Sequence, residues 1–273
     1  MMSDGAIGIF DSGVGGLSVV MQIAALLPDE PLIYYADSGR APWGVRSPGE
    51  IQQFSSEITR FLIDEGAKII VVACNTASVY ALATLRAEFP DIAFVGMVPA
   101  VKPAAQDSVT KKVAVLATAA TIRCEVLTEL VEKFARPLAV EVVFAVPHGL
   151  VELIEKGEVN SDATVSLLRE IVVPLLNDGV DTLVLGCSHY PFAADALRVV
   201  IEGRAHLIDP APAIARQCAR VLEERQLVCG QSDRGGLRSM RLYTSGDAAR
   251  VSKTVMVLTG VDIAAEWRDV VGF

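Results

Sequence analysis

Two cysteines each end a run of branched apolar residues, and a thiol in such a place could move protons. The stretch "IIVVACNTAS" (69–78) carries Cys74, and "TLVLGCSHYP" (182–191) carries Cys187. Apolar runs of this length predict buried strands, so each thiol stands where a strand ends. An isolated cysteine is more often a buried structural thiol than a reactive one. The polar residues that follow both thiols favour the reactive role.

The turn after the first thiol is polar. Asn75, Thr76 and Ser78 follow Cys74 at once, and a helical pattern comes next. Three polar side chains at a strand-to-helix turn do not suit a core, but they suit a site whose backbone N–H groups point at an anion. A helix N-terminus also helps a thiol to ionise. This turn therefore predicts a reactive thiol beside an anionic substrate.

The turn after the second thiol adds an acid–base partner. Ser188, His189 and Tyr190 follow Cys187, and Pro191 suits the first turn of a helix. A lone histidine is more often a packed or surface residue than a catalyst, but His189 lies two residues from a thiol in the same turn. Because imidazole titrates near neutral pH, His189 is a candidate proton carrier.

Carboxylates are the remaining acid–base candidates. Asp11 ends an early apolar run, and Ser12 and a glycine-rich turn follow. The glycine spacing matches neither the dinucleotide nor the P-loop fingerprint, and an aspartate would repel a phosphate. We expect Asp11 to act as a carboxylate at the site, and Ser12 with the next N–H groups to hold a small anion. Glu152 and Glu155 share one helical face, a pattern that alone is typical of a solvated surface.

Composition narrows the class of protein. The 273 residues are 52% apolar and 6% aromatic, which suits an α/β protein with an aliphatic core. The net charge of −9 and the lack of a basic stripe argue against nucleic-acid binding. The sequence shows no signal-peptide pattern and no apolar run of about 18 residues, so we expect a cytoplasmic protein without membrane contact. The five cysteines should then be reduced. None stands in a Cys-x-x-Cys pair, so we expect no metal site.

Short β-rich runs alternate with amphipathic stretches, which predicts parallel sheets covered by helices. In such sheets ligands bind beyond the carboxyl ends of the strands, where both thiols stand. The expected strands are Ala6–Phe10, Leu32–Tyr35, Lys68–Ala73, Ala93–Gly96, Lys112–Ala117, Val140–Ala145, Thr182–Leu185, Ala205–Ile208 and Arg241–Thr244. The expected helices include Leu17–Leu27, Pro48–Glu65 and Thr121–Phe134.

The order of these features occurs twice. A strand and polar turn at Asp11 precede the strand that ends at Cys74, and a strand and polar turn at Thr118 precede the strand that ends at Cys187. Two similar α/β units that face each other across a cleft would explain this repeated order, although the sequence identity between the two halves is slight. Proline-containing stretches at 96–105 and 207–215 are the expected connections between the two lobes. We therefore predict one lobe from residues 1–98 plus 209–273 and another from residues 99–208.

Taken together, the motifs resemble the signature blocks of bacterial glutamate racemases, in the cofactor-independent aspartate/glutamate racemase superfamily. The blocks occur in the order "GIFDSGVGGLSV", "YADSGRAPWG", "VVACNTAS", "ATAATI" and "LGCSHYP", and the late "LYTSGD" extends the resemblance from about residue 6 to 247. The resemblance implies two α/β lobes related by pseudo-twofold symmetry, with the active site in the cleft between them.

The resemblance also assigns chemistry. Racemisation needs a base on one face of the α-carbon and an acid on the other, and this family uses two thiols without a cofactor. Cys74 and Cys187 match them. Asp11 would assist Cys74, and His189 would assist Cys187. Spacing puts the family's second-lobe glutamate at Glu155, with Glu152 left open. The residues that match the family's substrate-binding positions are Ser12, Pro42, Trp43, Gly44, Asn75, Thr76, Thr118, Thr121 and Ser188.

The implied substrate is L- or D-glutamate, the implied role is supply of D-glutamate for peptidoglycan, and a homodimer is possible. Trp43 stands where tyrosine is common, and Ser188 replaces the usual threonine but keeps the hydroxyl. Aspartate racemase is the nearest alternative. Another is a binding protein that keeps the fold without turnover and acts on a partner such as DNA gyrase, as reported for some family members. The pair of thiols argues against lost activity, and the acidic charge argues against direct DNA binding.

Overall fold

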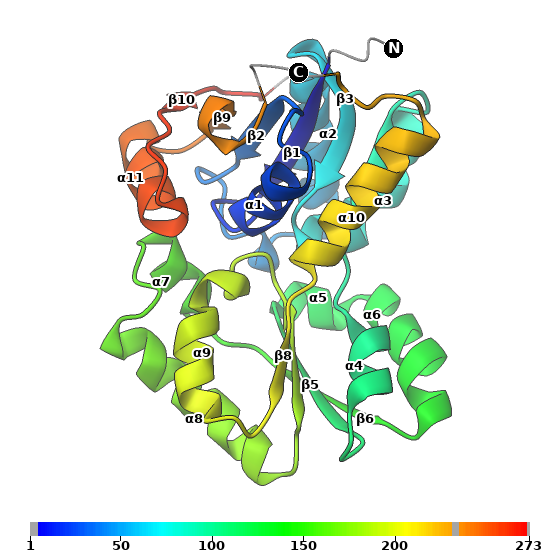
Figure 1. Cartoon of the computed structure of the whole chain (residues 1–273), viewed down its shortest axis with the longest axis vertical. Coiled ribbons are helices and arrows are strands. Elements are labelled where there is room, and N and C mark those ends of the chain that lie inside the picture. The colour runs from blue at the N-terminus through cyan, green and yellow to red at the C-terminus, as the bar shows by residue number, and fades with distance from the viewer. Residues whose placement is uncertain (1–4, 231–234, 272–273) are drawn as a thin grey trace. The chain divides into compact units, whose positions relative to one another are not determined.

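The computed structural model describes residues 5–230 and 235–271 and contains two separate parallel sheets with helices packed around them (Figure 1). The chain forms two compact units. The first comprises the described part of Met1–Met97 and Ala211–Phe273, and the second is Val98–Pro210. The predicted fold class, α/β with two similar parallel-sheet lobes, is confirmed.

The sheet of the first unit has the strand order β10-β9-β2-β1-β3-β4, and every neighbouring pair is parallel. All residues of the three central strands are buried, as expected where helices cover both faces of a parallel sheet. The strands are β1 (Ala6–Asp11), β2 (Leu32–Ala36), β3 (Ala67–Val72), β4 (Ala93–Gly96), β9 (Arg241–Thr244) and β10 (Ala265–Trp267). The sequence did not predict β10, because this short edge strand is largely exposed and has no apolar run.

Helices α1 and α10 pack together, as do α2 and α3 (Figure 1). The helices of this unit are α1 (Leu17–Leu26), α2 (Pro48–Asp64), α3 (Asn75–Glu88), α10 (Ala211–Glu224) and α11 (Ala248–Thr259). Helix α2 begins where Ser47 and Glu50 form a capping box, in which each side chain accepts a hydrogen bond from the other residue's backbone N–H.

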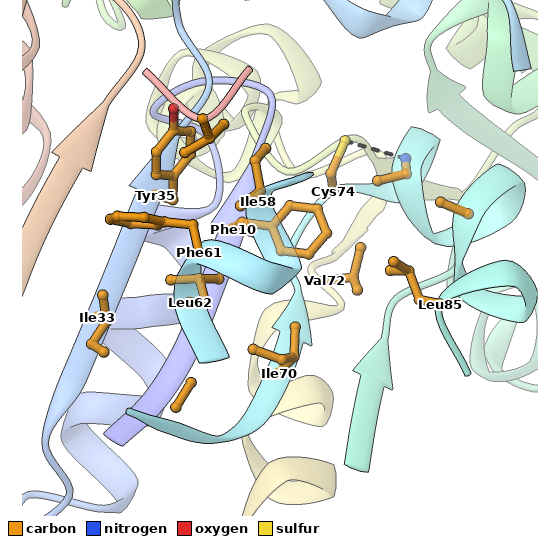
Figure 2. Close-up of a cluster of buried hydrophobic side chains, with 14 of the residues drawn as sticks. Phe10, Ile33, Tyr35, Ile58, Phe61, Leu62, Ile70, Val72, Cys74 and Leu85 are labelled. Atoms are coloured by element: carbon orange, nitrogen blue, oxygen red, sulfur yellow. Dashed lines mark hydrogen bonds between the residues drawn. The ribbon is translucent and has the colours of Figure 1, made fainter. Parts of the chain in front are cut away.

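One core cluster of this unit leads to the first thiol. Figure 2 shows Phe10 and Val72, from the ends of β1 and β3, packed with Ile58 of α2 and Leu85 of α3. Cys74 belongs to the same cluster. Close packing holds side chains in single conformations, so the thiol is carried on a rigid part of the unit.

The sheet of the second unit has the order β6-β5-β7-β8, which repeats the β2-β1-β3-β4 order of the first. Its strands are β5 (Lys112–Ala117), β6 (Glu141–Ala145), β7 (Thr182–Gly186) and β8 (His206–Ile208), and its helices include α4 (Val101–Asp107), α7 (Leu150–Glu155), α8 (Asp162–Asn177) and α9 (Ala194–Ile201). In both sheets the second strand lies on one side of the first strand, and the third strand lies on its other side. The switch points therefore lie between β1 and β3 and between β5 and β7, where such sheets bind ligands.

The single helix predicted over Thr121–Phe134 is wrong. The structure has α5 (Ala119–Arg123), α6 (Glu125–Leu130) and a π-helical turn at Val131–Ala135. The break is at Cys124, whose backbone is extended and whose N–H donates back to the carbonyl of Thr121. That bond closes α5 after little more than one turn, and a new helix starts with Glu125 at its positive end.

The half-buried carboxylate of Asp181 fixes the loop that enters the second sheet. Asp181 Oδ2 accepts hydrogen bonds from the N–H groups of Val109 and Thr110, both at 2.7 Å, and Oδ1 accepts from the hydroxyls of Ser108 (2.7 Å) and Thr182 (2.9 Å). Burial alone would raise the pKa of Asp181, but these hydrogen bonds outweigh it and lower the pKa from 3.8 to about 2. The ionised carboxylate therefore stabilises the folded chain.

We expect Asp181→Asn to lower the Tm by about 2–6 °C at neutral pH, because the loop loses hydrogen bonds to a charged acceptor. The folded-state pKa lies below the unfolded one, so the stabilisation is present above about pH 4 and is lost as the pH falls toward 2. The gap in Tm between variant and wild type should therefore shrink over that interval. Asp195→Asn, at an exposed i,i+3 ion pair with Arg198, is the control and should change the Tm little.

Candidate active site

Cys74 is the residue that caps α3. Its backbone is extended, and its Sγ accepts a hydrogen bond from the N–H of Ala77 at 3.4 Å (dashed in Figure 2). The Sγ also lies 4.0 Å from Oγ of Ser12, and the residue is 4% exposed. A hydrogen-bond donor and the positive end of a helix both favour the thiolate. The structure thus brings two of the predicted site residues, Cys74 and Ser12, together.

Asp11 stands at the end of β1, the strand next to the one that leads to Cys74. It is fully buried, and its Oδ2 accepts a hydrogen bond from the N–H of Gly16 at 2.8 Å. A Cβ at Gly16 would lie 2.8 Å from both Cβ of Asp11 and the hydroxyl oxygen of Tyr34. Only glycine permits this approach, so the turn after β1 holds the carboxylate in one place.

Asn75 has a side chain without a partner. The residue is 1% exposed, and neither Oδ1 nor Nδ2 has a hydrogen-bond partner among the residues that the structure describes. An unsatisfied buried polar group costs about 1–3 kcal/mol, so native proteins rarely leave one without a reason. An amide that offers both a donor and an acceptor beside Cys74 is suited to a polar ligand. Thr76, the next residue, is also buried.

Cys187 follows β7 directly and forms a chain of polar contacts. Its Sγ lies 3.9 Å from Nδ1 of His189, and Nε2 of His189 lies 2.7 Å from Oε1 of Glu155. A carboxylate can only accept, so Nε2 carries the hydrogen and Nδ1 of the neutral ring is left as the acceptor. The ring is thus arranged to take a proton from the thiol. Oγ of Ser188 lies 3.4 Å from the same Nδ1.

The two glutamates of α7 differ in the structure. Glu155, the last residue of α7, contacts His189, whereas Glu152, one turn earlier, is exposed. Spacing in the sequence favoured Glu155 but left Glu152 open. The histidine contact favours Glu155 as the carboxylate that orients the ring, in the way a third group orients the base of a catalytic triad.

The two cysteine turns are less alike than their sequences suggest. Helix α3 starts immediately after Cys74, but the chain after Cys187 forms a 3₁₀ turn, Tyr190–Ala193, and α9 starts only at Ala194. Pro191 is the second residue of that turn rather than the first of an α-helix. Cys74 therefore lies at a helix N-terminus, whereas the polar contacts of Cys187 lead to His189 and Glu155.

Thr118 follows β5 directly, as Ser12 follows β1 in the first unit. Its Oγ1 caps α5 by accepting from the N–H of Thr121 at 3.2 Å. The two threonine hydroxyl oxygens are 3.0 Å apart. Because β5 and β7 are neighbours, this hydroxyl pair belongs to the same end of the sheet as Cys187.

The loop with Pro42, Trp43 and Gly44 was predicted to bind substrate, and its tryptophan side chain points into the protein. Trp43 is 1% exposed, and its Nε1 donates to Oδ2 of Asp37 at 3.0 Å. Its indole is part of the core, so a contact with a ligand would come from the backbone of this loop. Asp37 was not among the site residues predicted from the sequence. The available signal was an acidic residue directly after a fully buried strand.

Within residues 5–230 and 235–271, no cluster of three or more His, Cys, Asp or Glu side chains is arranged to hold a metal ion. All five cysteines are free thiols. Across the same described ranges, no helix has the combined length and apolar character needed to cross a bilayer.

Each of the two similar sheets has a thiol with polar partners at its switch point. This arrangement suits an enzyme that moves protons, and the class of enzyme is an amino-acid racemase. The model of the Asp/Glu/Hydantoin racemase family matches residues 16–218. The chain belongs to this family and is an isomerase, which confirms the resemblance seen in the motifs.

Named relatives and solved structures agree with the family. A glutamate racemase of Roseiflexus sp. (strain RS-1) is 44% identical over 249 residues, which cover 91% of this chain and 90% of the relative. The crystal structure of glutamate racemase from Francisella tularensis in complex with D-glutamate has a TM-score of 0.84 at 27% identity and covers 100% of both chains. The Escherichia coli glutamate racemase in complex with L-glutamate and the activator UDP-MurNAc-Ala has a TM-score of 0.83 at 31% identity and covers 98% of this chain and 100% of the other.

Proposed function

We propose that this protein is a glutamate racemase in which Cys74 and Cys187 act on opposite faces of the substrate α-carbon. The observation that carries the proposal is the equivalent location of the two thiols after β3 and β7, the corresponding strands of two sheets with the same strand order. The names of the relatives and the D- and L-glutamate bound in two similar structures support glutamate as the substrate.

In the proposed reaction one thiolate removes the α-proton and the opposing thiol donates a proton to the other face. The α-proton is a far weaker acid than a thiol, so the negative charge that develops on the substrate carboxylate must be stabilised as an enediolate. Hydrogen-bond donors held in place before the reaction provide such stabilisation. The unpartnered amide of Asn75 and the hydroxyls of Thr76, Thr118 and Ser188 are the proposed groups.

Each thiol has its own means of exchanging protons in this proposal. Cys187 passes its proton to Nδ1 of His189, and Glu155 stabilises the imidazolium that results. Cys74 ionises with help from the N–H of Ala77, and Asp11 assists its proton transfer. These side chains do the chemistry without an electron sink.

We expect Glu155→Gln to lower kcat/KM for glutamate at least about tenfold, because an amide stabilises the imidazolium of His189 less than a carboxylate does. The loss should stay below the roughly 10⁴-fold effect of amidating the orienting carboxylate in a serine protease. Glu152→Gln is the matched control on the same helix and should stay within about twofold of wild type, because the residue is exposed. The reverse pattern would show that Glu152 is the working carboxylate.

We further propose that the enzyme works in the cytoplasm, supplies D-glutamate for peptidoglycan and forms a homodimer. Growth of a D-glutamate-requiring bacterium on expression of this chain tests the supply role. Light scattering on the purified protein tests the dimer.

The direct test of the substrate is circular dichroism of L-glutamate, D-glutamate, L-aspartate and D-aspartate incubated with the enzyme. We expect both glutamate signals to decay to zero and both aspartate signals to persist. Faster loss of the aspartate signals would make aspartate the substrate. Four unchanged signals would contradict catalysis and favour a binding protein.

A further inference from the structure

A buried carboxylate, Asp37, lies beneath the Pro42–Gly44 segment. Asp37 follows β2 and is 0% exposed. Its Oδ2 accepts from Nε of Arg40 at 2.8 Å and from Nε1 of Trp43 at 3.0 Å, and its Oδ1 accepts from Oγ of Ser245 at 2.6 Å. One carboxylate therefore joins the loop to the end of β9, some two hundred residues later in the chain.

The same carboxylate is tied to the end of β1. The backbone N–H of Asp37 donates to the carbonyl of Asp11 at 3.0 Å. Asp11 and the adjoining Ser12 belong to the proposed active site, so Asp37 connects the loop to the chemistry through a rigid backbone contact.

Arg40 balances the charge of Asp37 only in part. Its Nη1 also contacts Glu57 at 2.7 Å, and its guanidinium lies 4.1 Å from the ring centroid of Phe54. Two carboxylates thus share one cation, and burial raises the pKa of Asp37 above its usual value although Arg40 counteracts this. Buried ion pairs add little net stability. Their best-attested use is to specify one arrangement of the chain, so a geometric role is the natural explanation.

The fixed side chain of Trp43 restricts the conformation of the loop backbone. Its ring packs against Phe10 and Phe54, with centroid separations of 6.4 and 5.7 Å, while its N–H is held by Asp37. A side chain fixed by packing on two sides and by a directional hydrogen bond leaves its own backbone little freedom.

We propose that Asp37 and Trp43 are positioning residues that hold the backbone of Trp43 and Gly44 in the conformation that receives a substrate carboxylate. The inference rests on the proposed racemase function and extends it to residues that do not touch the substrate. The positioning role requires the hydrogen bond between Trp43 and Asp37. Glu57 has no part in it except to balance the charge of Arg40.

The test compares Asp37→Asn and Trp43→Phe with Glu57→Gln as the matched control from the same buried network. Each variant is assayed on glutamate and on aspartate, in both directions, together with its Tm. We expect Asp37→Asn and Trp43→Phe to raise KM at least about fivefold with a smaller change in kcat, since a misplaced donor weakens binding. Glu57→Gln should leave KM within about twofold of wild type even if its Tm falls.

Tryptophan fluorescence monitors the loop in an experiment that does not depend on turnover. The chain has two tryptophans, and Trp267 is 57% exposed on β10, so Trp267→Phe leaves Trp43 as the single reporter. Added glutamate should change its emission, and Asp37→Asn in this background should shift the emission and move the glutamate midpoint at least about fivefold higher.

Several results would overturn the positioning role while the racemase function stands. One is an unchanged KM in Asp37→Asn and Trp43→Phe despite a lower Tm, and another is an equal rise in KM for Glu57→Gln. Wild-type protein that racemises neither glutamate nor aspartate would instead contradict the proposed function, and the positioning role with it.

Discussion

Replacing Cys74 with alanine should abolish glutamate racemisation, and replacing Cys187 with alanine should do the same. Each variant loses the group that serves one face of the α-carbon, and a base on the remaining face cannot invert the centre. We expect rates at least about 10³-fold below wild type in either direction. The circular-dichroism assay measures this loss.

Two controls separate lost chemistry from lost structure. Burial raises the pKa of Cys218 to about 12, so this thiol stays protonated at neutral pH and Cys218→Ala should keep wild-type kcat. Each active-site variant also retains one thiol, so it should still exchange the α-proton of one enantiomer with solvent, and the two variants should prefer opposite enantiomers. Near-wild-type turnover in either variant would contradict the two-thiol assignment.

His189→Asn and Asp11→Asn should each lower kcat by about 10²–10⁴-fold, the usual scale for an acid–base assistant. The larger loss is expected for His189. Cys187 has no α-helix starting directly after it, whereas Cys74 keeps the N–H of Ala77 when Asp11 is replaced. Asparagine preserves an acceptor for Gly16 in place of Asp11, so the fold should be retained.

Steady-state kinetics in both directions over a range of pH measures these effects. Because the two enantiomers of glutamate have equal free energy in water, kcat/KM must stay equal in the two directions for every variant. Losses below about threefold for both variants would show that other groups activate the thiols.

The sequence predicted the parts of the fold that depend on local pattern. The strands of both sheets appear as runs of branched apolar residues because central parallel strands are buried on both faces. Their polar ends, such as Asp11, Cys74 and Cys187, mark the carboxyl edge where ligands bind. The predicted bounds of β1, β4, β5 and β9 differ from the structure by one residue at most.

Features that depend on tertiary contacts were missed or left open. Only the packing of α7 shows that Glu155, and not Glu152, contacts His189. The break at Cys124 comes without the proline or glycine that would have predicted it. The environment of Asp37 depends on Ser245, which is remote in the sequence, and no local pattern connects them.

The most direct test of the two-thiol mechanism is the isotopic composition of glutamate recovered early in a reaction in D₂O. If Cys74 and Cys187 serve opposite faces, the thiol that removes the α-proton does not deliver it to the other face, and the opposing thiol supplies deuterium from solvent. Starting from L-glutamate, the D-glutamate formed should carry deuterium at the α-carbon while the remaining L-glutamate carries very little. The same should hold with the enantiomers exchanged. Early deuterium in the recovered substrate at a level comparable to the product would contradict the two-thiol mechanism, even in an active racemase.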